Sequence, residues 1–123
     1  MAFRAMTGLV TEWFEPERYK VDEKTGELIE IVEESEGCTK VQIKPLSGSD
    51  FLSAVTAPGA ASQIITACRR GVVGWENLPD ENGSPVKFDE SKIIEVLPGE
   101  IMTVLSVRIL DLSKMSREQE KNS

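Results

Sequence analysis

Few side chains in this sequence could do catalytic chemistry, and their spacing fits none of the common reaction centres. Histidine, the commonest general base and the commonest metal ligand, is absent from all 123 residues. No serine lies in a Gly-x-Ser-x-Gly turn that would activate it as a nucleophile. Neither phosphate-binding glycine pattern, G-x-x-x-x-G-K-[ST] or G-x-G-x-x-G, occurs. The sequence therefore predicts a protein without enzyme activity.

Two segments resemble metal-binding patterns in outline but lack the ligands that a metal needs. Cys38 and Cys68 form no C-x-x-C pair, and two thiols without histidine cannot supply the roughly four ligands of structural zinc. In Asp80-Glu81-Asn82-Gly83 the glycine stands fourth, whereas the EF-hand loop needs it sixth. We expect no metal, no cofactor, two reduced thiols with Cys68 in a helix core, and a β-turn at Asn82-Gly83.

An acidic run in the first third of the chain could be taken for a cluster of catalytic carboxylates. A catalytic pair needs a fixed separation inside a pocket that splits the two pKa values. These carboxylates instead flank a predicted hairpin and a loop, so we interpret them as a solvated acidic face. Such a face can repel wrong partners or attract a basic one. The run consists of Glu27, Glu30, Glu33, Glu34 and Glu36.

Length and charge limit the classes of partner. With 14 Lys and Arg against 21 Asp and Glu, the net charge is −7, and 40% of residues are hydrophobic. This predicts one domain with its own core, and it argues against nucleic acid or an anionic membrane as the main partner. Residues 1–10 lack the apolar run of a signal peptide, and no stretch approaches a membrane span of about 20 residues. We expect a cytoplasmic protein.

The first third of the chain has the pattern of β-structure. Residues 18–21 and 28–32 surround a polar turn that ends at Gly26, which predicts a β-hairpin. Residues 39–44 alternate between apolar and polar side chains, as expected of a half-buried strand that Pro45 ends. The simplest arrangement is a meander of three antiparallel strands.

Helical periodicity begins after Pro45. Ser47 or Ser49 can cap a short helix, residues 60–70 form a second with Gly71 as its C-terminal cap, and Asp89 can cap a third. Pro98 opens the longest helix, and we expect residues 113–123 to be a flexible polar tail. The prediction is one α+β domain over residues 1–112, in which the meander precedes three to four helices. The apolar face of the longest helix consists of Ile101, Met102, Leu105, Ile109 and Leu112.

Two groups of apolar residues are candidates for a protein-binding surface. Trp75, beside Val73, is either a core residue or an interface anchor, since tryptophan is enriched in both places. Val104, Val107 and Leu110 lie off the apolar face of the longest helix. They either form a groove or oligomer face, or complete a core against the sheet.

Several segments together resemble a family. Gly71-Val72-Val73-Gly74-Trp75-Glu76-Asn77 precedes Asp80-Glu81-Asn82-Gly83-Ser84-Pro85-Val86 and Phe88. Ile43-Lys44-Pro45-Leu46 leads into a helix, and the chain ends in the polar run Ser116-Arg117-Glu118-Gln119-Glu120-Lys121-Asn122. Over roughly residues 39–122, this pattern resembles small tail proteins of long-tailed bacteriophages and prophages, namely the tail assembly chaperones and the minor tail components beside them.

The resemblance implies a non-catalytic, cytoplasmic assembly factor without a cofactor. Such chaperones coat the tape-measure protein before the tail tube polymerises around it, contact the tail tube subunit and self-associate. It implies protein-binding roles for the Trp75 region and the longest helix. These chaperones are largely helical, whereas residues 13–44 here have strand patterns. The alternatives are a structural virion component (a minor tail or head-tail connector protein) and a small acidic regulator that mimics the charge of nucleic acid.

Overall fold

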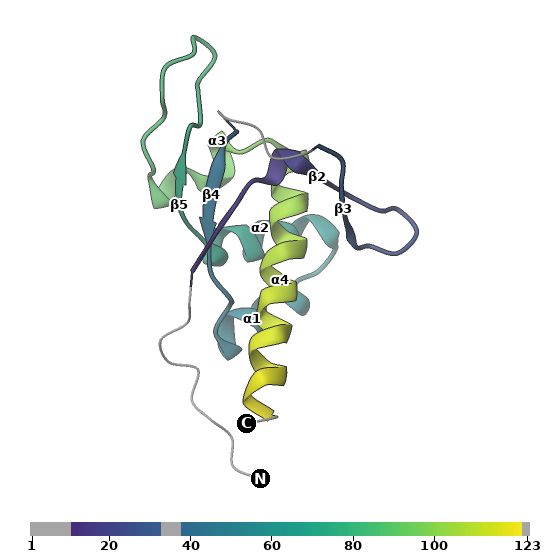
Figure 1. The fold of residues 1–123 in the computed structure, drawn as a ribbon. Helices are drawn as coiled ribbons and strands as arrows, with labels where there is room; N and C mark the ends of the chain where they lie inside the picture. Colours follow the sequence, from purple (N-terminus) through teal and green to yellow (C-terminus); the bar gives the residue numbers. More distant parts are fainter. Residues whose placement is uncertain (1–10, 33–37, 122–123) are drawn as a thin grey trace.

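The fold contains a three-stranded antiparallel sheet, which lies to the left of the longest helix in the view of Figure 1. The computed structural model describes residues 11–32 and 38–121, with side chains as far as Lys114. The sheet has the order β1-β4-β5, in which β1 spans Glu12–Phe14, β4 spans Lys40–Ile43 and β5 spans Val72–Glu76. Alternation along β4 buries Val41 and Ile43 on one face, as the sequence pattern predicts.

The predicted hairpin is confirmed, but it stands apart from this sheet. Strand β2 (Tyr19–Val21) pairs with β3 (Leu28–Glu30) as a separate two-stranded sheet after a short 3-10 helix, η1 (Pro16–Arg18). The α+β class and the three-stranded antiparallel sheet are confirmed, whereas the meander is wrong. Strand β4 instead pairs on both edges, with β1 before the hairpin and with β5 after two helices, so the three strands of its sheet are not consecutive in the chain.

Two consecutive helices connect β4 to β5. Helix α1 spans Gly48–Val55, and its N-cap is Ser47, whose Oγ accepts a hydrogen bond of 3.2 Å from the Asp50 N–H. Helix α2 spans Ala60–Gly71 and buries Ala67 and Cys68 against the core. Both helices begin where the capping and turn signals predict.

Gly71 serves a different purpose from the predicted C-terminal cap. It is the last residue of α2, and its φ lies outside the left-handed region that such a cap adopts. A Cβ at this position would lie 2.7 Å from both Cδ1 and Cγ2 of Ile109. Glycine is therefore required because α2 and the longest helix approach closely here.

This close approach predicts the effect of Gly71→Ala. The added methyl group should lower the free energy of unfolding by about 1–3 kcal/mol, the usual cost of overpacking a core. In an Ile109→Ala background, which removes the clashing atoms, the same substitution should cost less than about 0.5 kcal/mol. Denaturant unfolding of the four variants measures both values. An equal cost in the two backgrounds would contradict the explanation.

Two short helices precede the longest one. Asp89 caps η2 (Glu90–Lys92), as predicted for this residue, by accepting hydrogen bonds from the N–H and the hydroxyl of Ser91 at 3.0 and 2.7 Å. These hydrogen bonds lower the pKa of Asp89. Helix α3 (Ile93–Val96) follows directly and buries Ile93.

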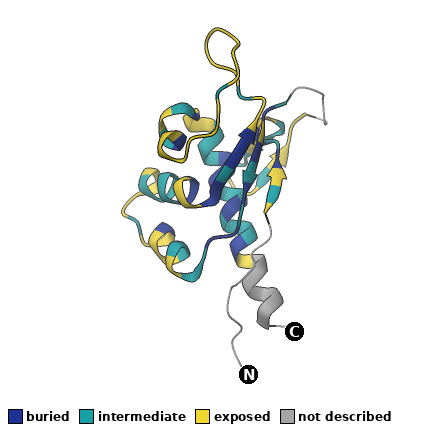
Figure 2. Cartoon of the chain, turned by 90° about the vertical axis from the view of Figure 1, so that its left-hand side faces the viewer, coloured by how far each residue is buried: buried dark blue, intermediate teal, exposed yellow. Residues whose placement is uncertain are grey.

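Helix α4 (Gly99–Lys121) runs through the middle of the molecule, where α2, η1 and the hairpin contact it. None of residues 101–113 is exposed, and Figure 2 shows buried residues gathered on this helix and the strands. A helix surrounded in this way must be apolar on more than one face. None of the helices in the described part of the chain has the length and apolarity needed to cross a membrane.

The predicted boundary between domain and tail, after residue 112, lies within helix α4. Helix α4 continues through residue 113 to Lys121, and Ser113 is fully buried. The Ser113 hydroxyl accepts a hydrogen bond from the Leu46 N–H and donates one to the Ile109 carbonyl, both at 2.8 Å. The predicted flexible tail also includes residues 115–123, whose side chains lie outside the described part of the chain.

The Ser113 hydrogen bonds predict the cost of Ser113→Ala. Removing the hydroxyl leaves the buried Leu46 N–H without an acceptor, so the free energy of unfolding should fall by about 1–3 kcal/mol. Thermal or denaturant unfolding measures the change. Ser113→Thr, which keeps the hydroxyl, is the comparison. A change below about 0.5 kcal/mol on Ser113→Ala would show that the hydroxyl is dispensable.

Candidate functional site

Trp75 is a core residue. Only 7% of its surface is exposed, and its Nε1–H donates a hydrogen bond of 2.9 Å to the Val86 carbonyl. The ring of Phe88 meets its ring edge-on, with the centroids 4.7 Å apart. Trp75 therefore attaches the exposed loop of residues 77–88 to the sheet, which supports the core interpretation over the interface anchor.

The loop that Trp75 holds contains much of the family-like sequence pattern. Asp80 organises it, because its carboxylate accepts hydrogen bonds of 2.9 Å from the N–H groups of Asn82 and Ser84. The predicted turn is present, with Gly83 at φ +82°, a conformation that favours glycine. The pattern around Trp75 is thus explained by a rigid loop fixed to the core.

The other predicted binding residues do not form one surface. Val73 is half-buried at an irregularity of β5, where the register with β4 shifts. Val104 is buried in the core, whereas Val107 and Leu110 are half-buried on α4. The structure therefore supports the alternative interpretation of Val104, that it completes the core.

Cys68 is buried in α2, as predicted for this thiol, and Cys38 and Cys68 form no disulfide. The Cys68 Sγ–H donates to the Met102 carbonyl at 3.2 Å, and burial raises the pKa of Cys68 from 9.0 to about 12. Within residues 11–32 and 38–121, no group of three or more Cys, Asp or Glu could hold a metal ion.

The raised pKa predicts a loss of stability in alkaline solution. A thiol whose folded-state pKa exceeds its unfolded value stabilises the fold fully below about pH 9, and that stability is lost as the pH rises to about 12. The loss should approach about 1.4 kcal/mol per pH unit at its steepest. Cys68→Ala, which has no thiol, is the reference in unfolding measurements between pH 8 and about 11. Parallel curves for the two proteins would refute the prediction.

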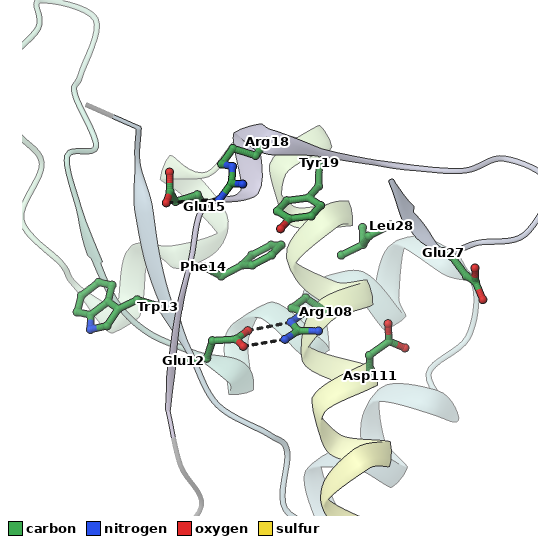
Figure 3. A pocket seen from close by; sticks show the side chains of 10 residues that line it. All are labelled: Glu12, Trp13, Phe14, Glu15, Arg18, Tyr19, Glu27, Leu28, Arg108 and Asp111. Atoms are coloured by element: carbon green, nitrogen blue, oxygen red, sulfur yellow. Dashed lines mark hydrogen bonds and ion pairs between the residues drawn. The ribbon is translucent and has the colours of Figure 1, made fainter. Parts of the chain in front are cut away.

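An open pocket of about 560 Å³ lies between β1, the hairpin and α4 (Figure 3). On one wall the Arg108 guanidinium donates two hydrogen bonds to the Glu12 carboxylate, at 2.8 and 2.7 Å. On another, the rings of Phe14 and Tyr19 stack with centroids 4.9 Å apart. The lining residues are Glu12, Trp13, Phe14, Glu15, Arg18, Tyr19, Glu27, Leu28, Arg108 and Asp111.

The arginines of this pocket have structural roles. Hydrogen bonding to Glu12 raises the pKa of Arg108, and hydrogen bonding to Glu30 at 2.7 Å raises that of Arg18. Arg108 connects β1 to α4, while Arg18 connects η1 to β3. Sequence reasoning missed the Glu12–Arg108 pair because the two residues lie 96 positions apart.

Groups of exposed apolar side chains lie at two places where sequence reasoning proposed no site, whereas Trp13 and Phe88 are exposed singly. We call Ile29, Ile31 and Val32 the hairpin patch; their exposed fractions are 40, 52 and 48%. We call Leu52 and Val55 on α1 the helix patch, at 58 and 40%. Glu27 and Glu30 of the predicted acidic face are exposed on the hairpin, whereas Glu33, Glu34 and Glu36 lie outside the described residues.

Comparisons with protein-family models, with curated proteins and with solved structures find no match. Function is therefore inferred from the residues of this chain. The physical features available for that inference are the acidic charge, the hairpin patch and the helix patch.

Proposed function

We propose that this chain is a non-catalytic tail assembly chaperone of a long-tailed bacteriophage or prophage. It binds the tape-measure protein, and also the tail tube subunit, during tail morphogenesis. The sequence support is the pattern from Ile43 to Phe88 with the polar end of α4. It acts in the cytoplasm of the infected or lysogenic bacterial host, associates with copies of itself, and binds neither nucleic acid nor membrane.

The observation that carries this proposal is the hairpin patch on an acidic protein. A chaperone for a long helical client needs accessible apolar surface, together with enough charge to remain soluble. Ile29, Ile31 and Val32 provide apolar surface on a chain of net charge −7. An isolated two-stranded hairpin is marginally stable, so its other face packs against the core through Tyr19, Val21 and Leu28. One face holds the hairpin in place and the opposite face remains available.

Co-expression tests the proposal. The tape-measure protein of the same phage or prophage should be insoluble when expressed alone and soluble when expressed with this chain. The two should then elute together from a sizing column. An unrelated acidic protein of similar size is the control for nonspecific solubilisation. A client that stays insoluble with this chain present would contradict the proposal.

Virion composition distinguishes the main alternative, a minor tail or head-tail connector protein. A chaperone leaves before the tail is complete, so mass spectrometry should find the chain in infected cells but not in purified virions. A fixed number of copies in each mature virion would establish a structural component instead.

A further inference from the structure

From the hairpin we infer the chemistry of the partner segment: an amphipathic helix with an apolar stripe bordered by lysine or arginine. This inference rests on the proposed function and specifies which part of a client this surface recognises. Its basis is the juxtaposition of the hairpin patch with three carboxylates of the hairpin that form no ion pair among the described residues, Asp22, Glu23 and Glu27.

The register of the hairpin assigns Ile29 and Ile31 of the hairpin patch to the face that points away from the core. Tyr19 pairs with Glu30 and Val21 with Leu28, and Tyr19, Val21 and Leu28 pack against the core. Lys20 pairs with Ile29, so these two residues point to the opposite side. The Ile31 N–H donates to the Arg18 carbonyl at 2.7 Å, which continues the ladder of the hairpin one residue beyond β3, so alternation places Ile31 on the same side as Ile29.

The spacing of this face suits a helix. Side chains two residues apart on a strand are separated by about 6.6 Å. Residues four apart on a helix are separated by about 6 Å along the axis, so one apolar stripe can follow both Ile29 and Ile31. A helix laid on this face buries side chains that the fold leaves in water.

Charge selects the kind of helix. The hairpin and its turn, residues 19–32, contain four acidic and two basic residues, a net charge of 2 − 4 = −2. Among the described residues, Asp22, Glu23 and Glu27 of the hairpin form no ion pair. Exposed charges act over a Debye length of about 10 Å at 0.1 M salt, which is comparable to the width of a helix. Basic residues bordering the apolar stripe are therefore attracted and acidic ones repelled.

The helix patch provides a contrast within the same chain. Leu52 and Val55 expose similar apolar surface. The only charged residue of α1, Asp50, lies 3.8 Å from the Arg70 guanidinium. The helix patch therefore has close to neutral surroundings. Comparing it with the hairpin patch separates the effect of apolar exposure alone from that of apolar exposure beside acidic charge.

Two synthetic helical peptides of about 20 residues test the inference on the full chain. Both carry leucine at every third or fourth position; one has lysine and the other glutamate at the bordering positions. The lysine peptide should bind at least about tenfold more tightly, and added salt should reduce the difference. Ile29→Gln with Ile31→Gln should weaken its binding by about tenfold, whereas Leu52→Gln with Val55→Gln should leave it unchanged. Glu23→Gln with Glu27→Gln should reduce the preference for lysine.

Several results would overturn the inference. These are no binding of either peptide, equal binding of both, or loss of binding only in the helix-patch variant. Its failure is distinguishable from failure of the chaperone proposal. If the tape-measure protein is solubilised without any preference for the lysine peptide, the chaperone proposal stands and this inference fails. If the lysine peptide binds at the hairpin while the client stays insoluble, this inference stands and the chaperone proposal fails.

Discussion

Replacing Trp75 with alanine should lower the free energy of unfolding by about 3–5 kcal/mol, even without any partner. The substitution removes a side chain that is 93% buried, together with its hydrogen bond to the Val86 carbonyl and its contact with Phe88. Denaturant unfolding of the isolated protein measures the loss. An interface anchor would behave differently, since truncating it would weaken a complex and leave the free protein stable.

Two comparison variants separate the contributions of Trp75. Trp75→Phe keeps most of the packing but loses the Nε1–H donor, so it should cost about 1–2 kcal/mol and loosen the loop of residues 77–88. Trp13→Ala removes the same side-chain type at a position that is 47% exposed, and it should cost less than about 1 kcal/mol. If Trp75→Ala were as mild as Trp13→Ala, Trp75 would not be a core residue.

The second large effect is expected at the hairpin patch. Replacing Ile29 and Ile31 together by glutamine should leave the free energy of unfolding within about 0.5 kcal/mol of the wild type, because both side chains are exposed. The same variant should lose at least about 90% of the soluble client obtained on co-expression, because the apolar docking surface is gone. Soluble client is measured by quantitative gel densitometry after centrifugation.

The helix patch supplies the matched control for this variant. Leu52→Gln with Val55→Gln also removes two exposed apolar side chains, but from helix α1. With this variant, client solubility should stay at the wild-type level. Equal losses in both variants would show that exposed apolar surface in general, and no particular site, solubilises the client. Loss in the control alone would move the docking surface to α1.

The accurate part of the sequence prediction concerns neighbours along the chain. Asp89, and Ser47 as one of two candidates with Ser49, could be predicted as helix caps because the atoms that they bind lie within three residues. The hairpin of β2 and β3 was identified because its strands surround one short turn. The partners of β4 could not be identified in this way. Pairing with β5 across two helices leaves no local mark, and Gly74 interrupts the pattern of β5.

The binding residues show the same limit. Periodicity assigns one apolar face to α4, but it cannot show how many elements surround the helix. Val104, Val107 and Leu110 lie off that face, so the pattern alone could not show that they pack against other elements. The useful signal lay in residues 28–32, where four of five residues are apolar and do not alternate. In a two-stranded hairpin, such a run must leave apolar side chains in water. The Glu12–Arg108 pair that attaches β1 to α4 joins positions too far apart for any local pattern to show.

Affinity purification of the chain from infected or induced host cells, before tails polymerise, tests the central claim most directly. The tape-measure protein should be the main protein recovered with it, and the Ile29→Gln, Ile31→Gln variant should recover little. Virions purified from the same culture should contain neither form. Recovery without the tape-measure protein, together with the chain at fixed stoichiometry in mature virions, would contradict the account.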